Sequence, residues 1–224
     1  MSAIVLAKVI PAEILAQIRE CIARGRFVEG RTTAVGGAAR SKQNLQLTRD
    51  DPAEHRAVEL LVGALQAHPP FQEATWPDAM MRPLFARYLP GMRYGDHVDG
   101  ALLGEPPDLI RCDVAVTLCI NDGSEYDGGE LVIDSSGIGY LWKGSAGDAI
   151  VYSADTLHRV NEVTRGARDV AVIWVQSMVR DAGQRRILFD LRSVLDSMDL
   201  AAAPSPHTET IRRTYFNLIR MWTD

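Results

Sequence analysis

The chain has 224 residues, a formal net charge of −5 and 46% hydrophobic residues. This length is sufficient for one large domain with a sizeable core, and no apolar run is long enough to cross a bilayer. The lysines and arginines form no basic block, which argues against nucleic acid as a partner. Three cysteines without a CxxC pair, and an N-terminus without the layout of a signal peptide, lead us to expect the reducing cytoplasm.

Two amphipathic helices are expected in the N-terminal part. Residues 11–24 carry apolar side chains at helical spacing after Pro11, which suits a first turn, and Gly25 follows as a stop. A second helix opens at Asp51-Pro52, and its apolar stripe contains Val58, Leu61 and Leu65. Such stripes are typical of packing surfaces, so we expect them to cover a sheet or a subunit contact and to bind no cofactor.

Short runs of β-branched and aromatic residues dominate the middle of the chain. Turn-forming residues separate them, for example Asn121-Asp122-Gly123 and Asp127-Gly128-Gly129. The expected strands are residues 82–89, 113–120, 130–134, 148–152 and 170–176. This spacing favours a mainly β sandwich or barrel with flanking helices over alternating strands and helices.

Three residues of this region form a candidate metal site. His97 and Asp99 stand two residues apart, and His158 follows in a later part of the β region. Two imidazoles and one carboxylate on one face of a metal are the ligand set of non-heme Fe(II) oxygenases. The triad also fits two other classes of protein: a cupin-like isomerase or hydrolase with Zn(II) or Mn(II), and a non-catalytic ligand-binding barrel.

Arg168 is a candidate anion-binding residue. Because side chains alternate along a strand, Arg168 shares a face with Val170, Val172 and Trp174. Its guanidinium is therefore predicted to point into an apolar interior, where a buried arginine requires an anion. Arg111 and Asp113, at the head of an earlier strand, are interpreted instead as a structural ion pair.

The C-terminal part is predicted to be helical. Residues 184–200 and 206–222 each carry an apolar stripe, and residues 201–205 read as a short linker between them. We therefore predict a β domain at residues 1–180 and a helical extension at residues 181–224. As for the N-terminal helices, these stripes are expected to cover the sheet or to form a contact between subunits of a homo-oligomer.

The motifs around these residues resemble those of the PKHD-type hydroxylases, which are relatives of the prolyl 4-hydroxylases among the Fe(II)- and 2-oxoglutarate-dependent dioxygenases. The similarity covers nearly the whole chain, and its motifs lie at residues 94–101, 126–131, 146–148, 157–160, 163–168 and 174–177. The resemblance implies a double-stranded β-helix, or jelly-roll, core. It also implies that a substrate is hydroxylated with O₂ while 2-oxoglutarate is converted to succinate, and that L-ascorbate keeps the iron ferrous.

The resemblance assigns roles to five residues. His97, Asp99 and His158 would be the Fe(II) ligands, and Arg168 would pair with the distal carboxylate of 2-oxoglutarate. Tyr88 corresponds to a tyrosine that precedes the first ligand motif in prolyl hydroxylases and donates its hydroxyl to that carboxylate. For Tyr88, a simple core position is an equal alternative.

The substrate is not determined by the sequence. The family resemblance implies a link to iron uptake, which would fit a siderophore-like small molecule as substrate. The relationship to prolyl hydroxylases would equally fit a peptide substrate. Residues 26–46, with Gly36-Gly37, Arg40 and Lys42, are interpreted either as a lid that contacts substrate or as an ordinary surface loop.

Overall fold

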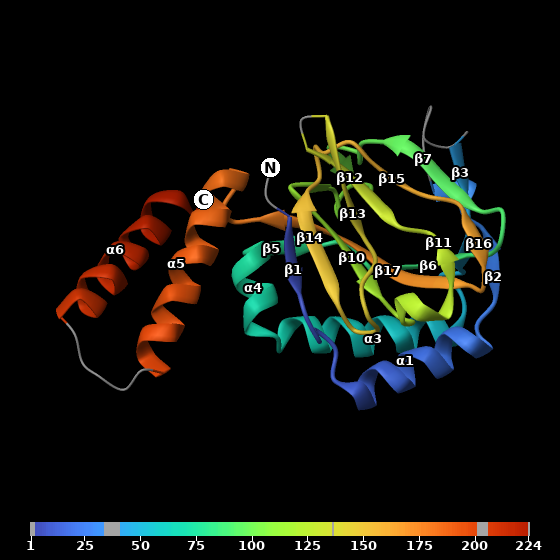
Figure 1. Cartoon of the computed structure of the whole chain (residues 1–224), viewed down its shortest axis with the longest axis horizontal. Coiled ribbons are helices and arrows are strands. Elements are labelled where there is room, and N and C mark those ends of the chain that lie inside the picture. The colour runs from blue at the N-terminus through green and yellow to red at the C-terminus, as the bar shows by residue number, and fades with distance from the viewer. Residues whose placement is uncertain (1–2, 34–40, 136, 201–205, 224) are drawn as a thin grey trace.

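Two antiparallel sheets face each other in the computed structural model, which describes residues 3–33, 41–135, 137–200 and 206–223. In this part of the chain, the larger sheet runs in the order β1-β14-β10-β17-β6-β4-β2, with β5 paired to β17, and the smaller sheet runs β13-β12-β15-β7-β3 (Figure 1). Their strands come from distant parts of the sequence, as in a jelly roll. The prediction of a mainly β core with flanking helices is confirmed.

The strand bounds of the larger sheet are β1 (Ile4–Leu6), β2 (Phe27–Glu29), β4 (Leu45–Leu47), β5 (Pro77–Met80), β6 (Leu84–Tyr88), β10 (Val114–Cys119), β14 (Ala149–Ser153) and β17 (Arg168–Ser177). The smaller sheet contains β3 (Lys42–Gln43), β7 (Arg93–His97), β12 (Leu131–Ser135), β13 (Ile138–Trp142) and β15 (His158–Val160). Two further two-stranded sheets pair β8 (Leu102–Leu103) with β9 (Ile110–Arg111) and β11 (Asp127–Gly128) with β16 (Val163–Arg165).

The larger sheet separates two apolar clusters. On β17, Ala171, Ile173 and Val175 pack into the cluster beneath the N-terminal helices. The alternate residues Val170, Val172 and Trp174 belong to the second cluster, which lies between the two sheets. Because Arg168 continues this second series, its predicted inward orientation is confirmed by the pattern of burial.

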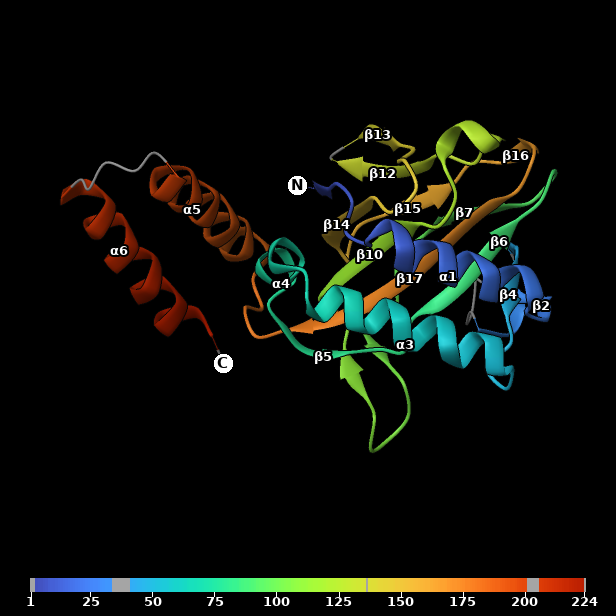
Figure 2. The same cartoon turned by 90° about the horizontal axis from the view of Figure 1, so that it is seen from below.

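The N-terminal helices cover the outer face of the larger sheet, as expected. They are α1 (Ala12–Arg24) and α3 (Pro52–Gln66), and Figure 2 shows both lying across β10, β17 and β6. The predicted stripes are buried, for example at Ile18 and Leu61. The Asp51 carboxylate accepts a hydrogen bond of 2.9 Å from the Ala53 amide, which caps α3 at its predicted start.

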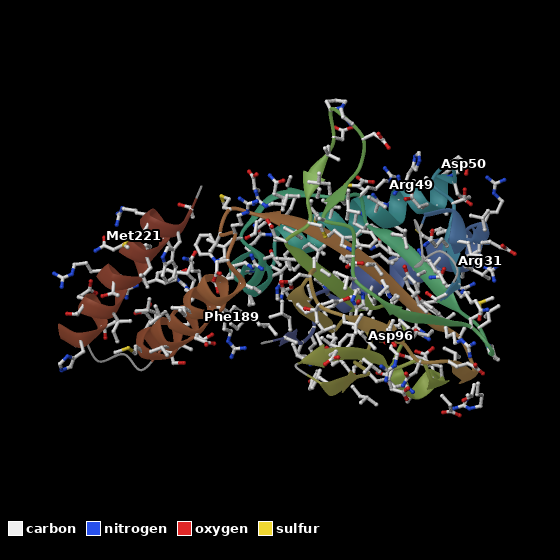
Figure 3. All side chains as sticks on the ribbon, turned by 90° about the horizontal axis from the view of Figure 1, so that it is seen from above. Arg31, Arg49, Asp50, Asp96, Phe189 and Met221 are labelled. Atoms are coloured by element: carbon white, nitrogen blue, oxygen red, sulfur yellow. The ribbon has the colours of Figure 1, made fainter. Side chains whose placement is uncertain are left out.

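The C-terminal helices do not cover the sheet. The helices α5 (Ala182–Leu200) and α6 (Pro206–Trp222) pack on each other, and α5 also contacts α4 (Pro69–Thr75), beside the barrel (Figures 1 and 2). Met221, labelled in Figure 3, lies on α6 and is exposed. The expectation that these stripes cover the sheet is therefore wrong; the contact between subunits stays a prediction.

No helix of the described residues is long and apolar enough to span a membrane.

Part of the segment interpreted as a lid or a loop belongs to the two sheets. Residues 27–29, 42–43 and 45–47 are the strands β2, β3 and β4. The positions between them that suggested a lid, Gly36-Gly37 and Arg40, lie outside the described residues. The lid therefore stays a prediction, but residues 42–47 belong to the sheets.

Candidate metal centre

The three candidate ligands come together at one end of the space between the sheets. His97 ends β7 and His158 begins β15, and these two residues are directly paired across the smaller sheet. Asp99 follows two residues after His97. One ligand atom from each of the three lies within 4.8 Å of the others, which is close enough for all three to bind one metal ion. Side chains distant in sequence are therefore assembled as predicted.

Backbone hydrogen bonds prepare both imidazoles to bind a metal. The Nδ1 atom of His97 lies 2.8 Å from the Gly95 carbonyl oxygen, and that of His158 lies 2.9 Å from the Thr156 carbonyl oxygen. A carbonyl oxygen only accepts, so each Nδ1 carries the proton and each Nε2 presents its lone pair. This orientation of histidine ligands is typical of metal sites.

Trp174 holds the third ligand and was not predicted. Its indole Nε1 donates a hydrogen bond of 2.8 Å to Oδ2 of Asp99. The other oxygen, Oδ1, faces the imidazoles and lies 4.0 Å from Nε2 of His158. Each of the three ligands therefore has one polar atom fixed by the protein and another directed at the common site. Two imidazoles and one carboxylate in this arrangement fit Fe(II).

Burial favours the protonation state of His97 that binds a metal. It lowers the pKa of His97 to about 4, with a further contribution from the neighbouring His158, so the imidazole is neutral at physiological pH. Burial also raises the pKa of Asp99, and His158 and the Trp174 hydrogen bond oppose this effect. The ring of Tyr94 stacks on His97 with centroids 3.6 Å apart and shields that ligand from solvent.

Arg168 and Tyr88 lie side by side deeper between the sheets. They are paired residues of β17 and β6, and the guanidinium carbon lies 5.1 Å from the centre of the tyrosine ring. Arg168 is 2% exposed, and no described carboxylate forms an ion pair with it. Burial raises the pKa of Tyr88, whereas Arg168 and a hydrogen bond with Asn44 lower it. These two residues therefore offer a buried cation and a hydroxyl to an anionic ligand.

Gly129, in a turn with Gly128, leaves room for the Arg168 side chain. Gly128 and Gly129 have φ angles of 70° and 66°, which disfavour any side chain. A Cβ atom on Gly129 would lie 3.0 Å from Cδ of Arg168 and 2.9 Å from Cγ2 of Val163. The sequence identified this Asp127-Gly128-Gly129 segment only as a turn, whereas in the structure it packs against the arginine.

The remaining candidates have structural roles. Nε of Arg111 donates to Asp113 at 2.8 Å, and Asp113 also accepts from the Ser177 amide at 2.9 Å. This geometry supports the interpretation of a structural ion pair. A cavity of about 260 Å³ lies elsewhere, between α1 and the larger sheet. Its two arginines are paired with carboxylates, Arg19 with Glu125 and Arg87 with Asp169, so this cavity offers no unneutralised cation.

Comparisons with known proteins agree with this geometry. Residues 83–176 match the sequence model of the 2OG-Fe(II) oxygenase superfamily. A PKHD-type hydroxylase of Hyphomonas neptunium is 40% identical over 221 residues, which cover 98% of both chains. Another, from Paraburkholderia phymatum, is 41% identical over 217 residues, or 96% of this chain and 95% of its relative.

Solved structures of low sequence identity share the fold. A prolyl-4-hydroxylase of Pseudomonas putida superposes with a TM-score of 0.53 at 19% identity, over 78% of this chain and 92% of its own. A prolyl hydroxylase of Trichoplax adhaerens gives a TM-score of 0.57 at 12% identity, over 83% and 86% of the two chains. The predicted double-stranded β-helix is thus confirmed. The near-complete matches at about 40% identity show that the chain belongs to the PKHD-type hydroxylases, which are Fe(II)- and 2-oxoglutarate-dependent enzymes of the 2OG-Fe(II) oxygenase superfamily.

Proposed function

We propose that His97, Asp99 and His158 hold the Fe(II) ion of this hydroxylase. The observation that carries the proposal is the cluster itself, in which one donor atom from each side chain lies within 4.8 Å of the others and the supporting hydrogen bonds occupy the opposite atoms. The triad binds one face of the metal and leaves the other face for co-substrate and O₂.

Arg168 and Tyr88 are the proposed anchor for 2-oxoglutarate. A planar guanidinium binds a carboxylate through two parallel, charge-assisted hydrogen bonds, which selects a dicarboxylic keto acid over a monocarboxylic one. The buried position of Arg168, beside the Tyr88 ring and on the inward face of the strand that also carries Trp174, supports this role.

Bound iron and 2-oxoglutarate supply the oxidising chemistry, in which O₂ is consumed, 2-oxoglutarate becomes succinate and CO₂, and a hydroxyl group enters the substrate. The protein orients the ligands and limits access of water. The apolar cluster between the sheets, which includes Leu131 and Ile133, surrounds the site for this purpose. L-Ascorbate is the proposed reductant that keeps the iron in the Fe(II) state.

Two substrate classes fit the proposal. Two of the structural relatives are prolyl hydroxylases, which supports a peptide, whereas a link of the family to iron uptake supports a siderophore-like small molecule. Catalysis in the reducing cytoplasm is compatible with the free thiols at Cys21, Cys112 and Cys119.

The test is a titration of 2-oxoglutarate into the anaerobic Fe(II) protein, followed by the visible charge-transfer band of the complex. Arg168→Met should weaken keto-acid binding about 100-fold or more, with Fe(II) binding unchanged. Arg159→Met is a matched control, because Arg159 follows His158 directly and its side chain, paired with Asp96 at 3.3 Å, is exposed (Figure 3 labels Asp96).

The same assay distinguishes the other two classes. If the wild-type protein gives neither a band nor succinate, the site serves a cupin-like metalloenzyme or a ligand-binding barrel, and the proposal is rejected. If the band forms equally well with Arg168→Met, another residue anchors the co-substrate.

A further inference from the structure

The segment at residues 42–46 connects the two sheets beside the metal centre. Lys42 on β3 pairs with Tyr94 in the smaller sheet, whereas Gln46 on β4 pairs with Ala86 in the larger sheet. The alternate residues Lys42, Asn44 and Gln46 are 6%, 5% and 3% exposed. Because residues two apart on an extended segment share a face, this edge of the barrel presents three polar side chains inward.

Lys42 lies at the metal end of this segment. Its Nζ is 5.4 Å from the centre of the Tyr94 ring, and that ring stacks on His97. Asp99 is close enough to raise the pKa of Lys42, although burial has the larger effect and lowers this pKa to about 8. The lysine is therefore still mainly an ammonium ion at neutral pH. A buried cation beside a metal site is costly, so it is expected to have a function.

Asn44 lies in the middle of the segment, close to Tyr88. A hydrogen bond between their side chains affects the pKa of Tyr88, and Tyr88 in turn contacts Arg168. Lys42 and Asn44 are two residues apart, which corresponds to roughly 6–7 Å along an extended chain. The stretch from Lys42 to Asn44 therefore runs from the metal ligands to the proposed anchor of the distal carboxylate, over a length similar to that of a five-carbon dicarboxylate.

We propose that Lys42 is a second anion-binding residue of the 2-oxoglutarate site and that its ammonium group pairs with the carboxylate at the metal end of the keto acid. This inference rests on the proposed function. 2-Oxoglutarate carries a negative charge at each end, and Arg168 neutralises only the distal one. Lys42 supplies the corresponding cation at the proximal end, so that the two cations fix both the position and the direction of the co-substrate.

The experiment compares two anions that differ at the distal end. Oxalate reproduces the metal-binding end of the keto acid and has no distal carboxylate. Both anions are titrated into the protein saturated with Mn(II), which binds without turnover, and affinity is measured by calorimetry or by water-proton relaxation. Lys42→Met should lower the affinities for 2-oxoglutarate and for oxalate by the same factor, roughly 10- to 100-fold. Arg168→Met should lower the affinity for 2-oxoglutarate and leave the affinity for oxalate unchanged.

Two further variants control for charge and for folding. Lys42→Arg keeps a cation at this position and should recover part of the affinity for both anions. Lys8→Met makes the same substitution at an exposed lysine and should bind both anions as the wild type does. Mn(II) affinity should not fall in Lys42→Met, because removal of a neighbouring positive charge reduces repulsion of the metal ion.

The proposal is overturned if Lys42→Met binds both anions normally, since Lys42 would then serve an anionic substrate or another purpose. It is equally overturned if only 2-oxoglutarate is weakened, because the effect would arise at the distal end through Asn44 and Tyr88. Failure of the wild-type protein to bind 2-oxoglutarate at all would instead refute the proposed function, and this outcome is distinguishable from the other two.

Discussion

Replacement of Trp174 by phenylalanine should weaken metal binding without changing the metal ligands. The substitution removes the indole N–H, which donates a hydrogen bond of 2.8 Å to Oδ2 of Asp99, and it keeps most of the aromatic surface. Asp99 is then free to rotate, and its buried Oδ2 loses its partner. Loss of such a supporting hydrogen bond typically lowers metal affinity about 10- to 100-fold, which corresponds to about 1.4–2.7 kcal/mol.

The assay is calorimetric titration of Mn(II) into the metal-free protein, with unfolding by urea as a check on the fold. Trp76→Phe is the matched control, because Nε1 of Trp76 is buried and forms no hydrogen bond with any described residue. This control should leave Mn(II) affinity unchanged. Equal affinities for Trp174→Phe and wild type would refute the argument that Trp174 orients Asp99.

Four further changes have defined outcomes. His158→Ala should abolish Mn(II) binding in calorimetry while far-UV circular dichroism stays native, since the imidazole faces the other two candidate ligands and not the apolar cluster beneath the N-terminal helices. Gly129→Ala should weaken 2-oxoglutarate binding but not Mn(II) binding, because its Cβ would displace Arg168. Arg185→Met leaves the Val179 and Arg180 carbonyl oxygens, bound at 2.7 and 2.9 Å, without their donor; about 1–3 kcal/mol of stability should be lost and α5 should become sensitive to limited proteolysis. Lys42→Met should stabilise the metal-free protein at pH 7 by up to about 3 kcal/mol in urea unfolding, because burial lowers the pKa of Lys42 from 10.5 to about 8. This gain should shrink between pH 8 and 10.5, where native Lys42 is already neutral while the unfolded chain still binds the proton; a constant gain over this range would contradict the assigned cause.

The sequence was sufficient to predict the central strands, because the residue patterns that indicate them are local. Runs of β-branched residues such as those of β10 and β17 are long enough to show alternation, and the turn residues between them mark their ends. The orientation of Arg168 followed from the same period of two. The three candidate metal ligands were selected by residue type, and the resemblance to the PKHD-type hydroxylases assigned their roles. The register of β7 with β15 then accounts for the pairing of His97 with His158.

Other parts depend on contacts that no local pattern encodes. The strand β15 has three residues and β3 has two, and both exist because neighbouring strands supply their hydrogen bonds. Trp174 and Asp99 are 75 positions apart, so their hydrogen bond follows only from the packing of the two sheets. Lys42 stands in a segment that was interpreted as a lid or a loop, and lysine rarely occupies a buried position, so nothing in the sequence pointed to its burial.

The position of the site between the sheets follows from the two faces of the central strands. On β10, Val116 and Leu118 pack beneath the N-terminal helices in the larger apolar cluster, which provides most of the aliphatic core. The opposite face can therefore carry polar residues, such as the buried Thr117, whose side chain forms a hydrogen bond with Tyr152. Substitutions on the helix-facing side should thus act mainly on the free energy of unfolding, whereas those on the inner face should act on binding. This division explains how one strand, β17, supplies both core residues and the proposed co-substrate anchor Arg168.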